Sequence, residues 1–302
     1  MTTSAHESTG TPGHPLVEVT GLNVVLPTGE RSEVEAVSNV NLVIHDGERV
    51  GLVGESGSGK SVTGRSIAGL LPTSPNVRVT GSIRIRGKEM VGAPARDWEE
   101  VRRRTVGMIF QDPLTFLNPT MRIGRQVAES IPPSRHHKDR SAREQAVHRF
   151  LSQAGLPDAE HVAASFPHEL SGGMRQRVLI AIAIAKLPSL VLADEPTTAL
   201  DATVQQHVLR TLDESVAELG TSLMLISHDL AVVAGMTDRV YVMYGGRIVE
   251  EGPTERVLAE PQHAYTQALL RSVRSLTDDD TELYSIPLAL RRQFSEEVPS
   301  AT

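Results

Sequence analysis

The sequence contains no cysteine. Disulfide bonds, cysteine-ligated zinc, iron–sulfur clusters and thiol catalysis are therefore excluded, and the composition suits a reducing compartment. Long apolar runs are also missing. The most apolar stretch, residues 178–185, is far shorter than the roughly 20 residues that cross a bilayer as a helix. We therefore expect no membrane-spanning segment.

Positive charge is not in excess either. Lysine and arginine number 30 against 37 aspartates and glutamates, which gives a formal net charge of −7. Proteins that grip nucleic acid by its phosphates usually carry the opposite balance. We therefore expect no nucleic-acid partner.

Short strands and helices alternate along most of the 302 residues. This alternation predicts an α/β fold with a mainly parallel sheet that is covered on both faces. The pattern predicts strands at 17–26, 39–46, 48–54, 81–87, 106–110, 190–193 and 222–226, and a hairpin at 239–252. It predicts helices at 60–71, 122–130, 142–154, 174–186, 202–219, 230–235 and 264–273.

Changes in composition divide the chain into segments. Residues 1–14 are polar and are expected to form a flexible arm. The main domain is expected over 15–252, with a helical insertion at about 112–170 that is rich in Pro, Arg and His. Residues 253–302 form a C-terminal extension that ends in a polar tail.

The string GESGSGKS fits the phosphate-loop pattern and lies between a predicted strand and a predicted helix. Glycines let backbone N–H groups turn around an anion, and the helix start adds favourable partial charge. Lys60 would reach the β- and γ-phosphates of a bound nucleotide, and the Ser61 hydroxyl would ligate Mg²⁺. A plain glycine-rich turn is the competing interpretation. The nucleotide-binding residues are predicted to be Gly54, Glu55, Ser56, Gly57, Ser58, Gly59, Lys60, Ser61 and Val62.

The string LVLADEP ends an apolar strand in two adjacent carboxylates, Asp194 and Glu195. Such neighbours repel each other unless a cation or a proton-transfer role offsets the repulsion. We assign Asp194 to Mg²⁺ and Glu195 to orienting and deprotonating the attacking water. Ordinary loop acidity is the alternative for this string alone.

The string LSGGMRQR places a serine and two glycines at the start of an apolar helix. A hydroxyl, backbone amides and the helix dipole would all face an anion there. A simple serine cap is the alternative. The residues assigned to this second anion site are Ser171, Gly172 and Gly173. Gln176 of the same string is added only by the family resemblance described below.

These strings resemble the ATP-binding cassette family, the ATPase subunits of ABC transporters. In the family's order they are GESGSGKS (Walker A), FQDP at 110–113 (Q-loop), LSGGMRQR (signature), LVLADEP (Walker B), ALD at 199–201 (D-loop) and ISHD at 226–229 (H-loop). The resemblance covers about residues 17–252. It implies a P-loop NTPase nucleotide-binding domain of the ABC type, with a mixed sheet, a helical subdomain and a short C-terminal extension.

The resemblance also implies a mechanism in which two such domains meet head to tail. Each ATP lies between the phosphate loop of one domain and the signature helix of the other. Gln111 would sense the γ-phosphate, His228 would hold it and orient Glu195, and Asp201 would communicate across the dimer. Taken alone, Gln111 also fits a surface glutamine and His228 a histidine at a turn. The implied Mg²⁺ ligands are Ser61, Gln111 and Asp194.

One position departs from the family. The aromatic residue that stacks on adenine, expected near Leu26, is missing, and the first aromatic residue of the chain is Trp98. Stacking on a ring contributes roughly 1–3 kcal/mol per base in nucleic-acid complexes, whereas Leu26 offers only apolar contact. We predict that Leu26 lines the nucleotide site and that discrimination between bases is weak.

Several strings are similar to the oligopeptide/dipeptide and nickel importer branch, among them MIFQDPLTFLNP, FPHELSGGMRQR, ADEPTTALDATVQ and PQHAYTQALL. The VMYGGRIVE hairpin favours the first of the two unlike ATPases that such importers often carry, and hence a heterodimer. The resemblance implies two membrane permease subunits, an extracytoplasmic solute-binding protein and a peripheral position on the cytoplasmic face of the cell membrane. A permease helix would dock near Gln111.

Peptides are the favoured cargo, with nickel or another small solute as the alternative. A cassette protein acting on ribosomes or DNA is disfavoured because the stretch between Gln111 and Leu170 is short. An ordinary P-loop kinase or GTPase would leave the signature and H-loop strings unexplained.

Overall fold

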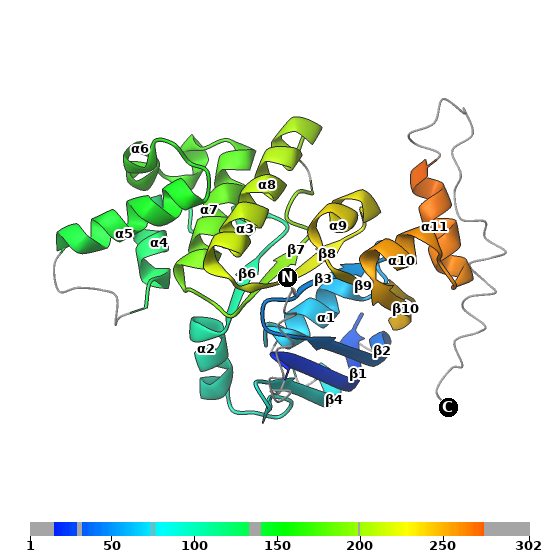
Figure 1. The fold of residues 1–302 in the computed structure, drawn as a ribbon. Coiled ribbons are helices and arrows are strands. Elements are labelled where there is room, and N and C mark those ends of the chain that lie inside the picture. Colours follow the sequence, from blue (N-terminus) through cyan, green and yellow to red (C-terminus); the bar gives the residue numbers. More distant parts are fainter. Residues whose placement is uncertain are drawn as a thin grey trace, which may run out of the picture.

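Two β-sheets organise the described part of the chain (Figure 1). The computed structural model describes residues 15–28, 32–72, 74, 76–132, 140–198 and 200–274. One sheet has the strand order β10-β9-β3-β8-β7-β6 and is parallel except for the β9–β10 pair, which confirms the predicted mixed sheet. Its strands are β3 (Arg49–Val53), β6 (Val106–Ile109), β7 (Leu190–Asp194), β8 (Ser222–Ser227), β9 (Arg239–Tyr244) and β10 (Arg247–Pro253).

The second sheet is antiparallel, in the order β2-β1-β4-β5. The sequence pattern located most of these strands but did not separate them from the main sheet. It also placed the start of β2 at residue 39, whereas the strand begins at Glu33. Residues 33–35 are exposed, so alternating burial begins only after them. The strands are β1 (Val17–Pro27), β2 (Glu33–Ile44), β4 (Arg78–Ile85) and β5 (Lys88–Glu89).

The predicted helices are present, and most agree with the prediction to within two residues. They are α1 (Lys60–Ile67), α4 (Ile123–Ser130), α5 (Arg140–Gln153), α7 (Gly172–Ala185), α8 (Ala202–Leu219), α9 (Leu230–Met236) and α11 (Ala264–Arg274). The helix from Lys60 ends before the predicted Leu71, because Gly69 has a φ of +62°. The Trp98 ring also covers Gly69 closely.

Four further helices were not predicted. All are short or expose most of their surface, so the apolar residues in them do not recur at a clear helical period. In α2, for example, Val101 is the one buried residue. They are α2 (Ala95–Arg104), α3 (Pro113–Phe116), α6 (Ala159–Ala164) and α10 (Thr254–Ala259).

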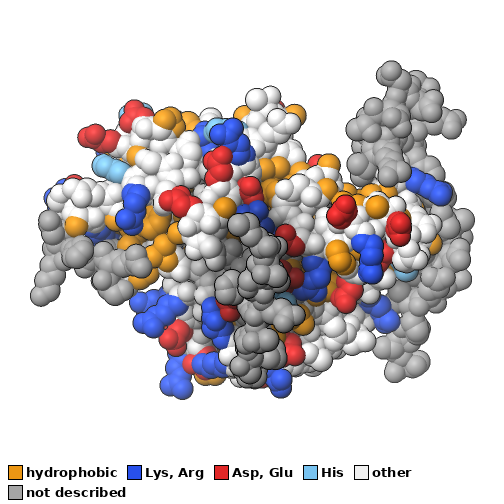
Figure 2. Space-filling model, viewed as in Figure 1, with side chains coloured by type: hydrophobic (Ala, Val, Ile, Leu, Met, Phe, Trp, Pro, Cys, Tyr) orange, Lys and Arg blue, Asp and Glu red, His pale blue; other side chains and the backbone are white. Residues whose placement is uncertain are grey.

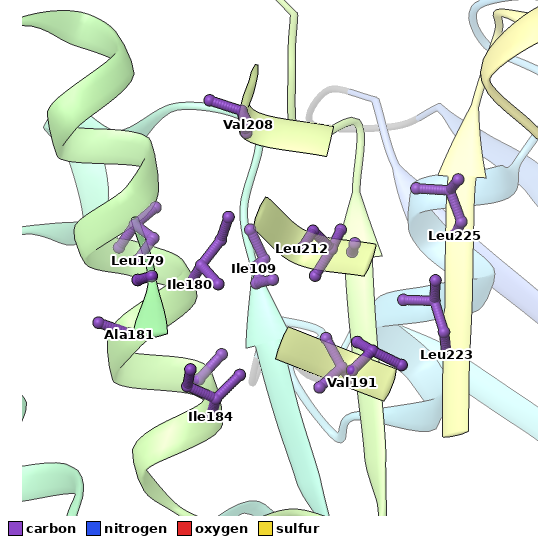
Figure 3. Packing of buried hydrophobic residues seen from close by; sticks show 14 of the residues in the cluster. Ile109, Leu179, Ile180, Ala181, Ile184, Val191, Val208, Leu212, Leu223 and Leu225 are labelled. Atoms are coloured by element: carbon purple, nitrogen blue, oxygen red, sulfur yellow. The ribbon is translucent and has the colours of Figure 1, made fainter. Parts of the chain in front are cut away.

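Alternate residues of the main sheet supply two separate cores. One face, which includes Val53, belongs to the core formed with α7 and α8. Figure 3 shows Val191 and Leu223 of this face beside these helices. The other face, with Leu52, Leu192 and Met224, packs against α1 and the antiparallel sheet. This period of two explains why the central strands read as continuous apolar runs, since both of their faces are buried.

Helices α3 to α7 and a 3₁₀ turn (Pro167–Glu169) lie between β6 and β7, and Figure 1 shows α4, α5 and α6 grouped at one end of the molecule. Helices α10 and α11 lie at the other end, near β10. The predicted arm (1–14) and most of the polar tail (from 275) lie outside the described residues. The segment boundaries themselves stay a prediction.

The visible surface carries charges of both signs interspersed (Figure 2). Within the described part of the chain, no helix combines the length and apolar character that crossing a membrane requires.

Candidate functional site

The carboxyl ends of four neighbouring parallel strands bring most of the predicted site residues together. Strands β6, β7, β8 and β3 are adjacent, and their end residues pair as Ile109–Ala193, Asp194–Ile226 and Val53–Ser227. The segments that follow these strands therefore lie side by side, at the edge where ligands bind in open α/β sheets. Those segments carry Gln111, Glu195, His228 and the phosphate loop.

Residues 54–59 form the loop between β3 and α1, and two of its glycines occupy positions that a side chain cannot. Gly54 has a φ of +152°, and a Cβ there would lie 2.1 Å from the Met243 carbonyl oxygen. Gly59 has a φ of +102°, and its Cβ would lie 2.4 Å from the Ala36 carbonyl oxygen. The curvature of the loop therefore depends on glycine.

The Lys60 side chain points back into this loop. It is only 3% exposed, and its Nζ donates to the carbonyl oxygens of Gly54 and Glu55, each at 2.8 Å. Burial lowers the pKa of Lys60, while the Glu195 and Asp194 charges act in the opposite direction. The ammonium therefore lies in a partly desolvated cradle that faces two carboxylates.

The other predicted nucleotide-binding residues are distributed around the loop and its neighbours. Ser56 and Gly57 are exposed, whereas Ser58 is buried. Val62 and Leu26 are partly buried and pack against the core beneath the antiparallel sheet. Part of the Leu26 side chain is therefore already committed to the core.

Ser61 and Asp194 form an oxygen pair suited to Mg²⁺. The Ser61 hydroxyl donates to Asp194 Oδ1 at 2.7 Å. Asp194 is 1% exposed, and its Oδ2 is buried without a hydrogen-bond partner, although Arg65 lies 3.6 Å away. Burial raises the pKa of Asp194, and the Glu195 charge adds to the rise. A hard cation ligated by oxygen would satisfy this orphaned acceptor, so the residues present fit Mg²⁺.

Glu195 is the point at which the other catalytic candidates meet. Its Oε2 accepts hydrogen bonds from Thr198 Oγ1 at 2.9 Å and Gln111 Nε2 at 3.4 Å, and it lies 3.4 Å from His228 Nδ1. Glu195 also has a φ of +48°. A non-glycine residue in this region is strained, and such strain clusters at functional sites.

The signature residues open a different helix. Ser171 caps α7 by accepting from the Met174 N–H at 3.3 Å. Ser171 and Gly172 are exposed, and Gly173 is buried against Val204, whose Cγ1 would lie 2.4 Å from an added Cβ. The two predicted anion-binding helix starts are therefore carried by separate elements, α1 and α7.

The predicted signature residue Gln176 lies inward. It is only 1% exposed, and its amide donates to the Phe110 carbonyl oxygen at 3.1 Å, next to the Q-loop. Its role toward a partner's nucleotide stays a prediction. Asp201, in contrast, is exposed and caps α8 by accepting from the Val204 N–H at 3.0 Å.

A family model described as "ABC transporter" matches residues 37–198. The chain belongs to the ABC transporter family. A second family model, "Oligopeptide/dipeptide transporter, C-terminal region", matches residues 249–296 of this ABC protein.

Relatives of this ABC protein include the oligopeptide transport ATP-binding protein OppD of Bacillus subtilis, 44% identical over 90% of the chain and 76% of that protein. The probable D,D-dipeptide transport ATP-binding protein DdpD of Escherichia coli is 47% identical over 85% of the chain and 78% of that protein. A solved dimeric structure of the ATP-binding cassette MJ0796 bound to ADP and Pi is 28% identical, with a TM-score of 0.68, over 79% of this chain and 98% of that one.

Three residues that touch the site of this ABC protein had no predicted role of their own. Thr198 bonds Glu195, Arg65 lies beside Asp194, and the Tyr265 hydroxyl accepts the Glu55 N–H at 2.9 Å. Thr198 and Tyr265 lie within two of the strings that are similar to the importer branch. That similarity was the signal that could have pointed to them. Their contacts depend on the fold, because Tyr265 is far from the loop in sequence.

Proposed function

We propose that this chain is the ATP-hydrolysing subunit of a peptide importer. The convergence of the phosphate loop, Asp194 and Glu195 at one sheet edge carries the proposal. The match of the C-terminal region to a family named for oligopeptide and dipeptide transport supports peptides as the cargo. The names of relatives that are 44% and 47% identical support the same cargo.

The residues divide the chemistry of phosphoryl transfer between them. Bound Mg²⁺, held by Ser61 and Asp194 with Gln111 nearby, would neutralise charge on the phosphates. The Lys60 ammonium has three N–H groups, so it can stay bonded to the two loop carbonyl oxygens and donate to a phosphate oxygen when ATP binds. Because these parts are already positioned, catalysis depends mainly on placement and charge.

Glu195 acts as the general base in this proposal. The carboxylate takes the proton of the attacking water, while the contacts that Gln111, Thr198 and His228 make with Oε2 hold it in place. Hydrolysis then converts ATP and water to ADP and phosphate.

A second ATPase subunit would complete the site. Ser171 and Gly172 are exposed at the start of α7, where a partner's γ-phosphate could accept their hydrogen bonds. Asp201 is exposed at the start of α8 and is the proposed contact for communication across the dimer. We infer that the partner is a related but different chain, as in importers with two unlike ATPases.

The permease subunits would dock beside the Q-loop. Leu114 and Phe116 of α3 are 60% and 45% exposed, and the Phe116 ring stacks on Phe110 at 3.5 Å. Phe110 directly precedes Gln111. A partner that binds Leu114 and Phe116 would therefore contact a residue pair that lies next to a catalytic candidate. This contact would hold the chain at the cytoplasmic face of the membrane, while an extracytoplasmic binding protein delivers the peptide.

Reconstitution tests this function. Liposomes containing the chain, its companion ATPase and the two permeases should hydrolyse ATP faster when the binding protein carries a peptide. Uptake of labelled peptide should require ATP and should stop in the Glu195→Gln variant. Stimulation by a non-peptide solute, with no response to any peptide, would overturn the proposed cargo.

A further inference from the structure

The C-terminal extension reaches the phosphate loop through one side chain. Tyr265, in the first turn of α11, is fully buried, and its ring packs at 4.5 Å against that of Tyr244 in β9. Its hydroxyl accepts the Glu55 N–H at 2.9 Å, across 210 positions of sequence. A residue of the extension therefore bonds the backbone of the nucleotide-binding loop directly.

This bond holds one end of a particular peptide group. The Glu55 N–H belongs to the Gly54–Glu55 peptide, whose carbonyl oxygen accepts from Lys60 Nζ at 2.8 Å. In a planar trans peptide the N–H and C=O groups point in opposite directions. The Tyr265 hydroxyl and the Lys60 ammonium therefore anchor the same rigid plane from its two sides.

The plane needs such an anchor because its flanking residue is a glycine. Gly54 has a φ of +152°, and it cannot gain a side chain that would restrict its rotation, since the Met243 carbonyl oxygen occupies the space. Glycine backbone rotates readily. Without an acceptor for the Glu55 N–H, the plane could turn and carry its carbonyl oxygen away from Lys60.

Helix α11 is itself fixed firmly enough to act as a support. The Glu250 carboxylate of β10 accepts the N–H groups of Gln262 at 2.8 Å and His263 at 3.0 Å, just before the helix begins. Ala268 and Leu269 of α11 are buried in the same core as Val53 of β3. The helix is therefore part of the core that carries the phosphate loop.

We propose that Tyr265 is a positioning residue for nucleotide binding, which acts through the Gly54–Glu55 peptide on the Lys60 ammonium. The inference rests on the proposed binding of ATP at this loop. The C-terminal extension thereby takes part in forming the ATPase site, in addition to any part that the extension has in assembly of the transporter.

The Tyr265→Phe variant tests the proposal, because it removes the hydroxyl and keeps the ring. In the full-length chain, we expect the Kd for MgADP to rise roughly fivefold, in line with the loss of one neutral hydrogen bond. In the reconstituted assembly, the KM for ATP should rise by a similar factor with kcat changed less than twofold. Glu195 and its partners are untouched, so chemistry should be spared.

Tyr241→Phe is the matched control. Tyr241 is also buried, in the core on the other face of the sheet, and its hydroxyl likewise accepts a backbone N–H, that of Val43 at 3.0 Å, which is not part of the loop. The Tyr241 hydroxyl accepts from Arg239 as well. This variant should lower the Tm but leave the MgADP affinity within twofold. If both variants weaken binding equally, or if Tyr265→Phe leaves it within twofold, the proposal is wrong.

Two further measurements address coupling and folding. In a Lys60→Ala background, Tyr265→Phe should produce no additional loss of affinity for a fluorescent ADP, and an undiminished loss would contradict action through Lys60. Should Tyr265→Phe fail to fold, Glu250→Gln leaves Tyr265 in place and weakens the start of α11. It should raise the Kd in the same direction, and an unchanged Kd would overturn the proposal. Failure of the unaltered chain to bind MgADP would instead overturn the proposed function.

Discussion

The Ser61 hydroxyl and the Asp194 carboxylate are hydrogen-bonded at 2.7 Å, although 133 positions separate them in the sequence. The bond joins the first turn of α1 to the end of β7. It satisfies one carboxylate oxygen and leaves the other buried without a hydrogen-bond partner. Arg65 lies 3.6 Å from that second oxygen without hydrogen-bonding it, so the buried charge is only partly compensated until a bound cation is added.

Replacement of Asp194 by Asn should stabilise the nucleotide-free chain and abolish Mg²⁺-dependent binding. The amide keeps the bond from Ser61 and removes the buried charge. We expect the Tm to rise by about 2–4 °C, which corresponds to roughly 1 kcal/mol for a chain of this size. Calorimetry without nucleotide measures the gain. A Tm below that of the original protein would contradict it.

The same pair of proteins should differ in pH dependence. Burial raises the pKa of Asp194, so the native state binds this proton more tightly than the unfolded state. Stability from this group therefore falls as the pH rises from the ordinary carboxyl pKa through the raised one. The Tm advantage of Asp194→Asn should grow across that window and then level off, as thermal melts from pH 4 to pH 8 would detect. An advantage that shrinks with rising pH would exclude this cause.

Glu195→Gln should retain nucleotide binding and lose hydrolysis. The substitution preserves size and hydrogen bonding to Thr198 but removes the basic oxygen, so we expect kcat to fall roughly 10²- to 10⁴-fold. ATP should then accumulate with a closed dimer, which size-exclusion chromatography with the companion ATPase would reveal. Rapid turnover by this variant would rule out Glu195 as the base.

Gly54→Ala should be far more damaging than Gly47→Ala. Both glycines have positive φ, but a Cβ at Gly54 would lie 2.1 Å from a backbone oxygen, whereas one at Gly47 meets nothing within 4 Å. We expect Gly54→Ala to lower the free energy of unfolding by about 3 kcal/mol or more. Gly47→Ala introduces backbone strain alone and should lower it by about 1–2 kcal/mol. Urea unfolding of both variants gives the comparison, and equal losses would contradict the contact.

Because Leu26 stands where an adenine-stacking aromatic residue is expected, the nucleotide site should discriminate weakly between ATP and GTP. If apolar contact is all that this residue offers the base, GTP should inhibit ATP hydrolysis nearly as well as an equal concentration of a non-hydrolysable ATP analogue. Leu26→Tyr should strengthen nucleotide binding several-fold by stacking. Inhibition by GTP that is much weaker than by the analogue would show that another residue reads the base.

Phe116→Ser should weaken association with the permeases roughly tenfold, because exposed aromatics at an interface centre often contribute more than 1 kcal/mol. Val34→Ser is the matched control, since Val34 is 46% exposed but lies on the antiparallel sheet. Co-purification with tagged permeases measures both. Equal retention of the two variants would place the docking surface elsewhere.

Much of the fold could be read from the sequence because its signals are local. The phosphate loop, the Ser171 cap and the apolar strands each show within a few residues, and each is present where it was expected. Helix α2 was not predicted because it buries one residue, Val101, and a single apolar position cannot show the spacing of an amphipathic helix. The separation of β1, β2 and β4 into their own sheet was missed because strand pairing is a long-range choice.

The site shows the same division. The sequence by itself determined which groups are present: a glycine loop, a lysine, two carboxylates, a glutamine and a histidine, in an order that identifies the family. Only the tertiary structure decided that Gln176 turns inward to Phe110 and that Tyr265 supports Glu55. The physical reason is that a hydrogen bond requires two groups within about 3 Å, and packing of distant helices against one sheet, not spacing along the chain, sets that distance.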